Sequence, residues 1–197
     1  MAESDARERI LRASRQEIAR TGVRGLRVQR VAKRAGVSLG LVYYHFEDRS
    51  GLLNATIDAV NLAVQERNPD PDDGSSAVVD LLVAEFDDEG DVRDDSVVWN
   101  EIRAIAVFET DLQNGLSRST AEWELRLHGP LAQAGVAEEQ IPEVATLLTA
   151  LVEGLSSRWL SGQLGTADAQ RLVRAGADAI LHTARTSRVP GETLPRE

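Results

Sequence analysis

The feature that most constrains this chain is the stretch VAKRAGVSLGLVYYHF, which covers residues 31–46. Apolar residues recur at helical spacing on both sides of Gly36-Val37-Ser38, and each of the two patterns is only about two turns long. Gly36 suits the left-handed conformation that ends a helix, and Ser38 is a favoured N-cap residue. The stretch therefore predicts two short helices joined by a tight turn, which is a helix-turn-helix.

Four adjacent ring side chains end the second of these helices. Phe46 and Val42 lie on the face that would pack against the first helix, so we expect them in the core. Phenol and imidazole groups can donate a hydrogen bond and also make apolar contact, which suits the phosphates and base edges of DNA. The side chains left near the exposed face are the candidates for DNA contact: Ser38, Gly40, Tyr43, Tyr44 and His45.

Helical periodicity continues along the chain, and no strand alternation persists. The first helix is expected to begin at a cap on Ser4 or Asp5 and to end at Thr21-Gly22, and Asp48 is expected to cap the fourth. Five more helices are expected near residues 76–88, 96–110, 112–128, 139–162 and 167–186. The predicted fold class is therefore all-α, with about nine helices.

Composition predicts two domains and a tail. The segment NPDPDDGSS, which follows Arg67, is rich in residues that break helices and is interpreted as a linker. We expect a helix-turn-helix domain over residues 1–67 and a helical domain over residues 68–187. Residues 188–197 contain two prolines and few apolar residues, so a flexible tail is expected there.

The charge of the chain is distributed unevenly. The whole chain has a net charge of −10, but residues 1–50 hold 11 basic and 6 acidic residues, which leaves 11 basic and 26 acidic residues in the remainder. A polyanion such as DNA would be attracted to the N-terminal part and repelled by the rest. A solvated helix face that is rich in arginine would give the same pattern, so charge alone leaves both interpretations open.

Composition also argues against other classes of function. Cysteine is absent, and the histidines His45, His128 and His182 are far apart, without metal-ligand spacing. We therefore expect no catalytic residues, no metal and no cofactor. The N-terminus is charged where a signal peptide would be apolar, and no apolar run is long enough to cross a bilayer. The sequence thus predicts a cytoplasmic protein with no membrane partner.

Residues 7–60 resemble the TetR family of bacterial transcriptional regulators. The resemblance rests on the long first helix that ends in Thr21-Gly22, on VAKRAGVSLGLVYYHF, and on EDRSGLL at residues 47–53. It implies an all-helical homodimer whose N-terminal domain binds a palindromic operator in double-stranded DNA. It also implies a C-terminal domain that forms the dimer and binds a small-molecule effector, which releases the repressor from DNA. GLLNAT and EGLSSRWL are similar to the choline-responsive branch of this family.

Several positions depart from the family pattern. Leu39 stands where a lysine often reads a base, so it either touches a thymine methyl group or packs, and we favour packing. Leu41 stands where a threonine is frequent. Arg49 replaces the usual lysine at the start of the fourth helix and keeps the charge for a phosphate contact. Arg27 stands where many relatives have a threonine just before the second helix, and we expect Arg27 and Gln29 to make supplementary DNA contacts.

The C-terminal domain contains candidates for a pocket and for a dimer interface. Polar residues interleave with two tryptophans, which favours a partly apolar cavity lined by Trp99, Arg103, Phe108, Trp123 and Leu127. The last two long helices look like the dimer-forming pair of the family, with interface candidates Leu147, Leu151, Leu155, Trp159, Leu172, Ala177, Ile180 and Leu181.

Two alternatives stay open at this stage. The buried core of a monomer would produce the same periodicity in the last two helices as a dimer interface. A helical adaptor for protein partners, or an enzyme with no role on DNA, is the alternative to the function of a transcriptional regulator. Binding of the chain to a promoter fragment would distinguish a regulator from both the adaptor and the enzyme.

Overall fold

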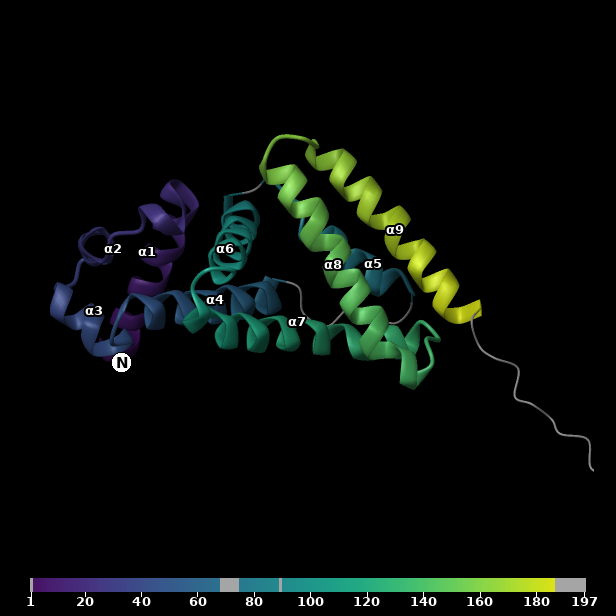
Figure 1. The fold of residues 1–197 in the computed structure, drawn as a ribbon, viewed down its shortest axis with the longest axis horizontal. Helices are drawn as coiled ribbons and strands as arrows, with labels where there is room; N and C mark the ends of the chain where they lie inside the picture. Colours follow the sequence, from purple (N-terminus) through teal and green to yellow (C-terminus); the bar gives the residue numbers. More distant parts are fainter. Residues whose placement is uncertain (1, 68–74, 89, 187–197) are drawn as a thin grey trace, which may run out of the picture.

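The computed structural model describes residues 2–67, 75–88 and 90–186, and every regular element in these ranges is helical, which confirms the predicted all-α class. The α-helices are α1 (Ala2–Gly25), α2 (Val28–Ala35), α3 (Leu39–Phe46), α4 (Arg49–Arg67), α5 (Ser75–Val83), α6 (Gly90–Ala106), α7 (Gln113–Gln133), α8 (Ile141–Leu160) and α9 (Thr166–Thr186). Two short 3-10 helices, η1 (Thr110–Leu112) and η2 (Glu138–Gln140), precede α7 and α8. Helices α1 to α4 gather at one end of the molecule, here called the head, and α5 to α9 form the body (Figure 1).

The observed helix boundaries differ from the expected ones at a few ends. α1 starts at Ala2, ahead of the predicted caps, and its helical backbone is broken at Gly22, where the sequence predicted its end. α6 starts at Gly90, earlier than expected. The prediction missed this start because the charged residues of the first turns show no apolar periodicity. α7 continues through Pro130 in its last turn, although a proline has no N–H for the helical hydrogen bond to the preceding turn. Residues 68–74 of the predicted linker, and the predicted tail, lie outside the described residues.

The core of the head joins the helix-turn-helix to the rest of the molecule. Apolar side chains from α1 to α4 meet there, and α6 and η1 of the body complete it. Its members include Ile10, Ile18, Val31, Val42, Phe46, Leu53, Val98, Ile102 and Leu112. Because α6 packs against α1 and α4, a movement of α6 would reach the helix-turn-helix through these two helices. The division of the chain at residue 67 stays a prediction.

A second core fills the body between α5, α7, α8 and α9. Its members include Val78, Leu82, Phe86, Leu131, Leu148, Val173 and Leu181. Trp159 packs edge-on against Phe86, with ring centroids 5.7 Å apart, and its indole Nε1 donates a hydrogen bond to Thr166 Oγ1 at 3.0 Å. α8 and α9 lie side by side along the flank of the body that is remote from the head (Figure 1).

Candidate DNA-binding surface and effector pocket

The turn between α2 and α3 has the geometry that the sequence predicts. Gly36 is left-handed, with φ 67° and ψ 39°. Its N–H donates to the carbonyl of Lys33, and the N–H of Val37 donates to the carbonyl of Ala32, which is the Schellman arrangement at the end of a helix. The Ser38 hydroxyl then accepts a hydrogen bond from the N–H of Leu41 at 3.1 Å and caps α3. These bonds fix the angle between the two helices.

The ring side chains of α3 divide between the core and the surface, and His45 is less exposed than predicted. Phe46 and Val42 are buried, whereas 71% of Tyr44 and 43% of Tyr43 are exposed. His45 is half-buried between the rings of Tyr44 and Phe46. Among the remaining candidates on this helix, Ser38 and Gly40 are exposed, and Leu39 packs against the core of the head. The open face of α3 thus presents the two tyrosines.

Arg49 is engaged within the chain, which sequence reasoning did not foresee. Its Nη2 donates a hydrogen bond to the carbonyl of Val23 at 2.8 Å, and its Nη1 lies 3.4 Å from Oε2 of Glu109. The guanidinium therefore ties the start of α4 to the end of α1 and to the loop after α6. No sequence pattern links Arg49 to Glu109, because they are 60 positions apart. Its contact with a DNA phosphate stays a prediction.

The other predicted DNA contacts lie on the exposed side of α2 and just before it. Arg27 is exposed and donates from Nη1 to the carbonyl of Arg24 at 3.2 Å, and Gln29 is exposed on the first turn. The structure adds three arginines that the sequence analysis counted only as charge: Arg20, Arg30 and Arg34 surround the buried carboxylate of Glu17. The spacing of Arg30 and Arg34 by one helical turn was the available signal.

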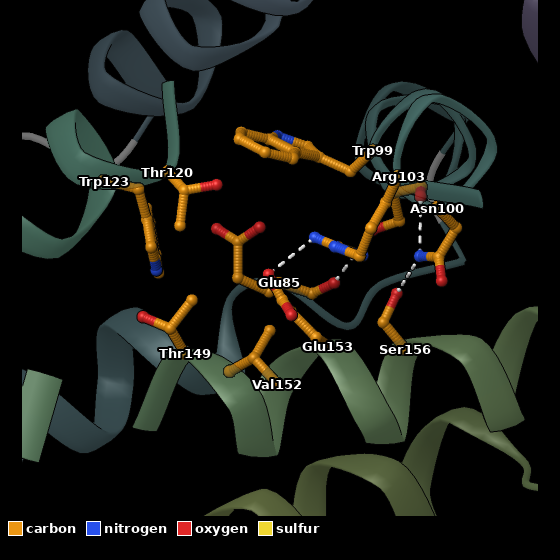
Figure 2. A pocket seen from close by; sticks show the side chains of 11 residues that line it. Glu85, Trp99, Asn100, Arg103, Thr120, Trp123, Thr149, Val152, Glu153 and Ser156 are labelled. Atoms are coloured by element: carbon orange, nitrogen blue, oxygen red, sulfur yellow. Dashed lines mark hydrogen bonds and ion pairs between the residues drawn. The ribbon is translucent and has the colours of Figure 1, made fainter. Parts of the chain in front are cut away.

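A small cavity of about 50 Å³ lies in the body between α6, α7 and α8. A cavity of roughly 10 to 15 Å³ holds one water molecule, so this cavity has room for a small ligand. Figure 2 shows side chains from all three helices, and Glu85 from the turn after α5, converging on it. The lining residues are Glu85, Ser96, Trp99, Asn100, Arg103, Thr120, Trp123, Thr149, Val152, Glu153 and Ser156.

The polar groups of this pocket are partly paired with one another. Arg103 Nη2 lies 2.8 Å from Oε1 of Glu153, and Asn100 Nδ2 donates to Ser156 Oγ at 2.9 Å. The guanidinium of Arg103 also stacks over the Trp99 ring, 5.7 Å from its centroid. The buried Thr149 Oγ1 has no hydrogen-bond partner within the described part of the chain, so it can bond to a ligand.

Glu85 is one of the lining residues that sequence reasoning missed. Burial raises the pKa of its carboxyl group to about 7, against the attraction of Arg67 and Arg126, which lowers it, and the repulsion of Asp95 adds to the rise. Glu85 lies in a turn because α5 ends at Val83, whereas the sequence predicted a helix that continues to residue 88. Helical periodicity also does not say which distant side chains lie beside a residue, so it could not place Glu85 near Trp99 and Trp123. The pocket therefore contains a carboxyl group that titrates near neutral pH.

Three of the five predicted pocket residues line this cavity, namely Trp99, Arg103 and Trp123. The structure does not bring the other two to it. Leu127 is fully buried in the core of the body, one turn beyond Trp123 on α7. Phe108 is 76% exposed and lies after α6, near Thr21 and Gly22 of the head. The sequence pattern placed four of the five residues on the correct helices, α6 and α7, but it did not predict how deeply each side chain is buried.

The predicted dimer residues divide between the outer face of α8 and α9 and the interior. Leu147 is 49% exposed, and Leu151, Leu155, Leu172 and Ile180 are half-buried, so all five are accessible to a partner. The assignment of Trp159, Ala177 and Leu181 to the outer face was wrong, because all three are buried in the core of the body. Leu147 and Ile180 line one surface groove between the two helices.

The described residues contain no metal-binding group of three or more His, Asp or Glu side chains. In the same ranges, no helix has both the length and the apolar character that crossing a membrane requires.

Comparison with known proteins assigns a family to both parts of the chain. Residues 10–56 match the model of bacterial regulatory proteins of the tetR family, and residues 74–182 match the C-terminal model of BetI-type transcriptional repressors. The HTH-type transcriptional regulator BetI of Stenotrophomonas maltophilia is 31% identical over 169 residues, which cover 80% of this chain and 81% of that protein.

Solved structures agree with this assignment. A TetR-family transcriptional regulator from Rhodococcus sp. has a TM-score of 0.84 and 39% identity, over 90% of this chain and 99% of the other. A transcriptional regulator from Saccharomonospora viridis, solved in complex with choline, has a TM-score of 0.74 and 24% identity, over 91% of this chain and 97% of the other. With its helix-turn-helix and its two family matches, the chain belongs to the TetR family and is a DNA-binding transcriptional regulator.

Proposed function

We propose that the pocket between α6, α7 and α8 binds a small cationic effector, and that binding releases a homodimeric repressor from a palindromic operator. The observation that carries the proposal is the charge of the pocket, where the carboxyl groups of Glu85 and Glu153 face the single guanidinium of Arg103. When Glu85 is ionised, the lining has one unbalanced negative charge. A cation restores the balance, whereas an anion would have to displace Glu153 from Arg103.

The remaining lining groups suit a small ammonium compound that also has a hydroxyl group. Trp99 and Trp123 provide aromatic faces, which attract quaternary ammonium ions. The unpaired hydroxyl of Thr149 can bond to a ligand hydroxyl. The C-terminal family match over residues 74–182 spans every lining residue, and the Saccharomonospora viridis relative was solved with choline. We therefore take choline as the first ligand to test.

Two polar links connect the pocket to the head. Arg67, at the end of α4, attracts the carboxyl group of Glu85 and lies 2.7 Å from Oδ2 of Asp95, and Asp95 Oδ1 in turn lies 3.3 Å from Arg15 of α1. On α6, two residues after Trp99, Glu101 accepts a hydrogen bond from the N–H of Val23 at 2.8 Å. A ligand that changes the position of α6 would act on α1 through these contacts, provided that its affinity differs between the two arrangements.

The proposal is tested with choline and with its neutral isostere, in which carbon replaces the ammonium nitrogen. Choline should change the tryptophan fluorescence saturably and should weaken binding to an operator duplex that the protein itself selects from a random-sequence library. The isostere has nearly the same shape and lacks the charge, so it should bind at least tenfold more weakly if a cation–π contact and a carboxylate hold the ammonium group.

Variants separate the pocket from the rest of the molecule. Glu85→Gln should weaken choline binding, because it removes the charge that attracts the ammonium group; operator binding without ligand is measured beside it, because Arg67 connects Glu85 to the head. As a control, Glu143→Gln removes a charge from α8 on the groove that contains Leu147, outside the pocket, and should leave choline binding unchanged. Equal binding of choline and the isostere would contradict a cationic effector, and bound choline with unchanged operator affinity would contradict release.

A further inference from the structure

One buried carboxylate organises three arginines on the surface of the head. Glu17, on α1, is 1% exposed, whereas the side chains of Arg20, Arg30 and Arg34 are 55%, 58% and 42% exposed. Arg20 Nη2 lies 3.0 and 3.2 Å from the two oxygens of Glu17, and Arg30 Nη1 lies 3.4 Å from one of them. Arg34 Nη2 lies 3.6 Å from the other oxygen. We call these three residues the arginine cluster.

The arginine cluster has more charge and more donors than Glu17 can satisfy. Three guanidinium groups meet one carboxylate, so two positive charges remain unbalanced at the surface. Each guanidinium has five N–H donors, and the ion pairs with Glu17 occupy only one or two of them. The three side chains are partly exposed, so their remaining donors are available at the surface, and one buried carboxylate contacts all three. Such an arrangement suits an anion with several oxygens.

The position of the cluster identifies the anion. Arg30 and Arg34 belong to α2, the first helix of the helix-turn-helix, and α2 lies next to α3 at the same end of the molecule (Figure 1). When the second helix of this motif enters the major groove, the first helix crosses the sugar-phosphate backbone. Arginine on that helix therefore meets phosphate groups, which it can bind with two parallel hydrogen bonds.

We propose that Glu17 is a positioning residue for DNA binding, and that it holds Arg20, Arg30 and Arg34 in the orientation in which they contact backbone phosphates. The cluster contributes affinity for any DNA sequence and does not read bases. Without Glu17, the three long side chains would repel one another and regain rotamer freedom, so each phosphate contact would have to order its arginine again.

The proposal predicts a change in DNA affinity opposite in sign to the change that charge alone would cause. Glu17→Gln removes a negative charge close to a polyanion, which on charge alone should strengthen DNA binding. If Glu17 positions the arginines, the same change should weaken binding of the full-length protein to a random-sequence duplex by about threefold to tenfold. The slope of log affinity against log salt should also fall by about 0.9 for each phosphate contact that is lost.

Glu47→Gln is the matched control for charge. Glu47 is exposed in the same head, directly after α3, so its removal changes the net charge equally without touching the cluster. This variant should bind the random duplex as tightly as the wild type or more tightly. If Glu17→Gln also binds as tightly as the wild type or more tightly, with an unchanged salt slope, the positioning role is overturned.

Surface variants keep the test decisive if Glu17→Gln does not fold, which circular dichroism would show. Arg30→Ala and Arg34→Ala alter exposed side chains and should each lower the salt slope on the random duplex by about 0.9. If Glu17→Gln does fold, each of these substitutions should cost less in that background than in the wild type. Arg171→Ala removes an exposed arginine from α9 and should have no effect. Unchanged slopes in both Arg30→Ala and Arg34→Ala would refute the phosphate contacts, and with them the proposal.

Discussion

The titration of Glu85 is the residue-scale property that most directly reports on the pocket. Its pKa is raised from 4.5 to about 7, mainly by burial. The folded protein therefore holds this proton more tightly than the unfolded chain does. The stabilisation by the neutral acid is complete below about pH 4.5 and is lost as the pH rises through about 7.

Glu85→Gln should remove this dependence on pH. The amide is neutral at every pH, so the free energy of unfolding of the variant, relative to the wild type, should rise by about 3 kcal/mol between about pH 4.5 and about pH 8. Urea denaturation at several pH values measures this difference. In the wild type, the affinity for choline should increase from about pH 6 to about pH 8, because ionised Glu85 attracts the cation. A difference in unfolding free energy that is the same at all pH values would contradict the raised pKa.

Tyr44 offers a second residue-scale prediction. It is the most exposed ring of α3 and projects from the open face of the recognition helix. Tyr44→Ala should weaken binding to the selected operator by roughly 1 to 3 kcal/mol and binding to random DNA by much less. The reason is that the substitution removes a contact with a base and leaves the phosphate contacts in place. Binding titrations on both duplexes, with circular dichroism as a check of folding, measure this. An equal loss on the two duplexes would show that Tyr44 positions the protein and reads no base.

At the scale of elements, the break in α1 is a point where the body contacts the head through side-chain hydrogen bonds. Gly22 has φ 68° and ψ 167°, a conformation that is almost restricted to glycine. Both backbone groups of the next residue, Val23, are bonded to side chains. Its N–H donates to Glu101, and its carbonyl accepts a hydrogen bond from Arg49, each at 2.8 Å. A Cβ at position 22 would lie 2.7 Å from Oε2 of Glu101. The break, α4 and α6 thus form one joint.

Gly22→Ala should therefore be costly for two reasons, strain in the backbone and displacement of Glu101. We expect it to lower the free energy of unfolding by about 1 to 3 kcal/mol. Gly162→Ala is the matched control, because Gly162 also has a positive φ, 75°, but its added Cβ would meet nothing within 4 Å. The control should lose less stability than Gly22→Ala. Chemical denaturation of both variants measures the difference, and equal losses would mean that the contact with Glu101 contributes nothing.

The elements also show what helical periodicity can and cannot predict. It identifies the buried face of each helix, and the turn residues Gly36 and Ser38 fix the helix-turn-helix locally, so the DNA-binding head followed from the sequence. Periodicity does not say which neighbour covers a buried face. For this reason Leu127 was expected in the pocket and Trp159 in the dimer interface, although both fill the core of the body. Glu85 and Glu17 act through contacts between distant segments, which no local pattern reveals.

At the scale of the whole molecule, the flank formed by α8 and α9 is the surface that we expect to bind a second copy. It lies on the side of the body remote from the head, and a groove along it is lined by the exposed Leu147 and the half-buried Ile180. A dimer joined there leaves both heads free for two half-sites of one operator. In a helix-turn-helix dimer these half-sites are about one helical turn of DNA, or 34 to 36 Å, apart.

Charge placed on this flank should therefore separate the protomers and weaken operator binding in the same step. Leu147→Glu combined with Ile180→Glu should give a monomer by light scattering, since two carboxylates per protomer would be buried unpaired in the joined surface. Leu125→Glu is the matched control, because Leu125 is also apolar and 61% exposed, but it lies on α7; this variant should stay dimeric. The monomer should keep its weak affinity for random DNA and lose most of its preference for the operator, because a single head binds only one half-site. A double variant that is folded and still dimeric would place the interface on another surface of the body.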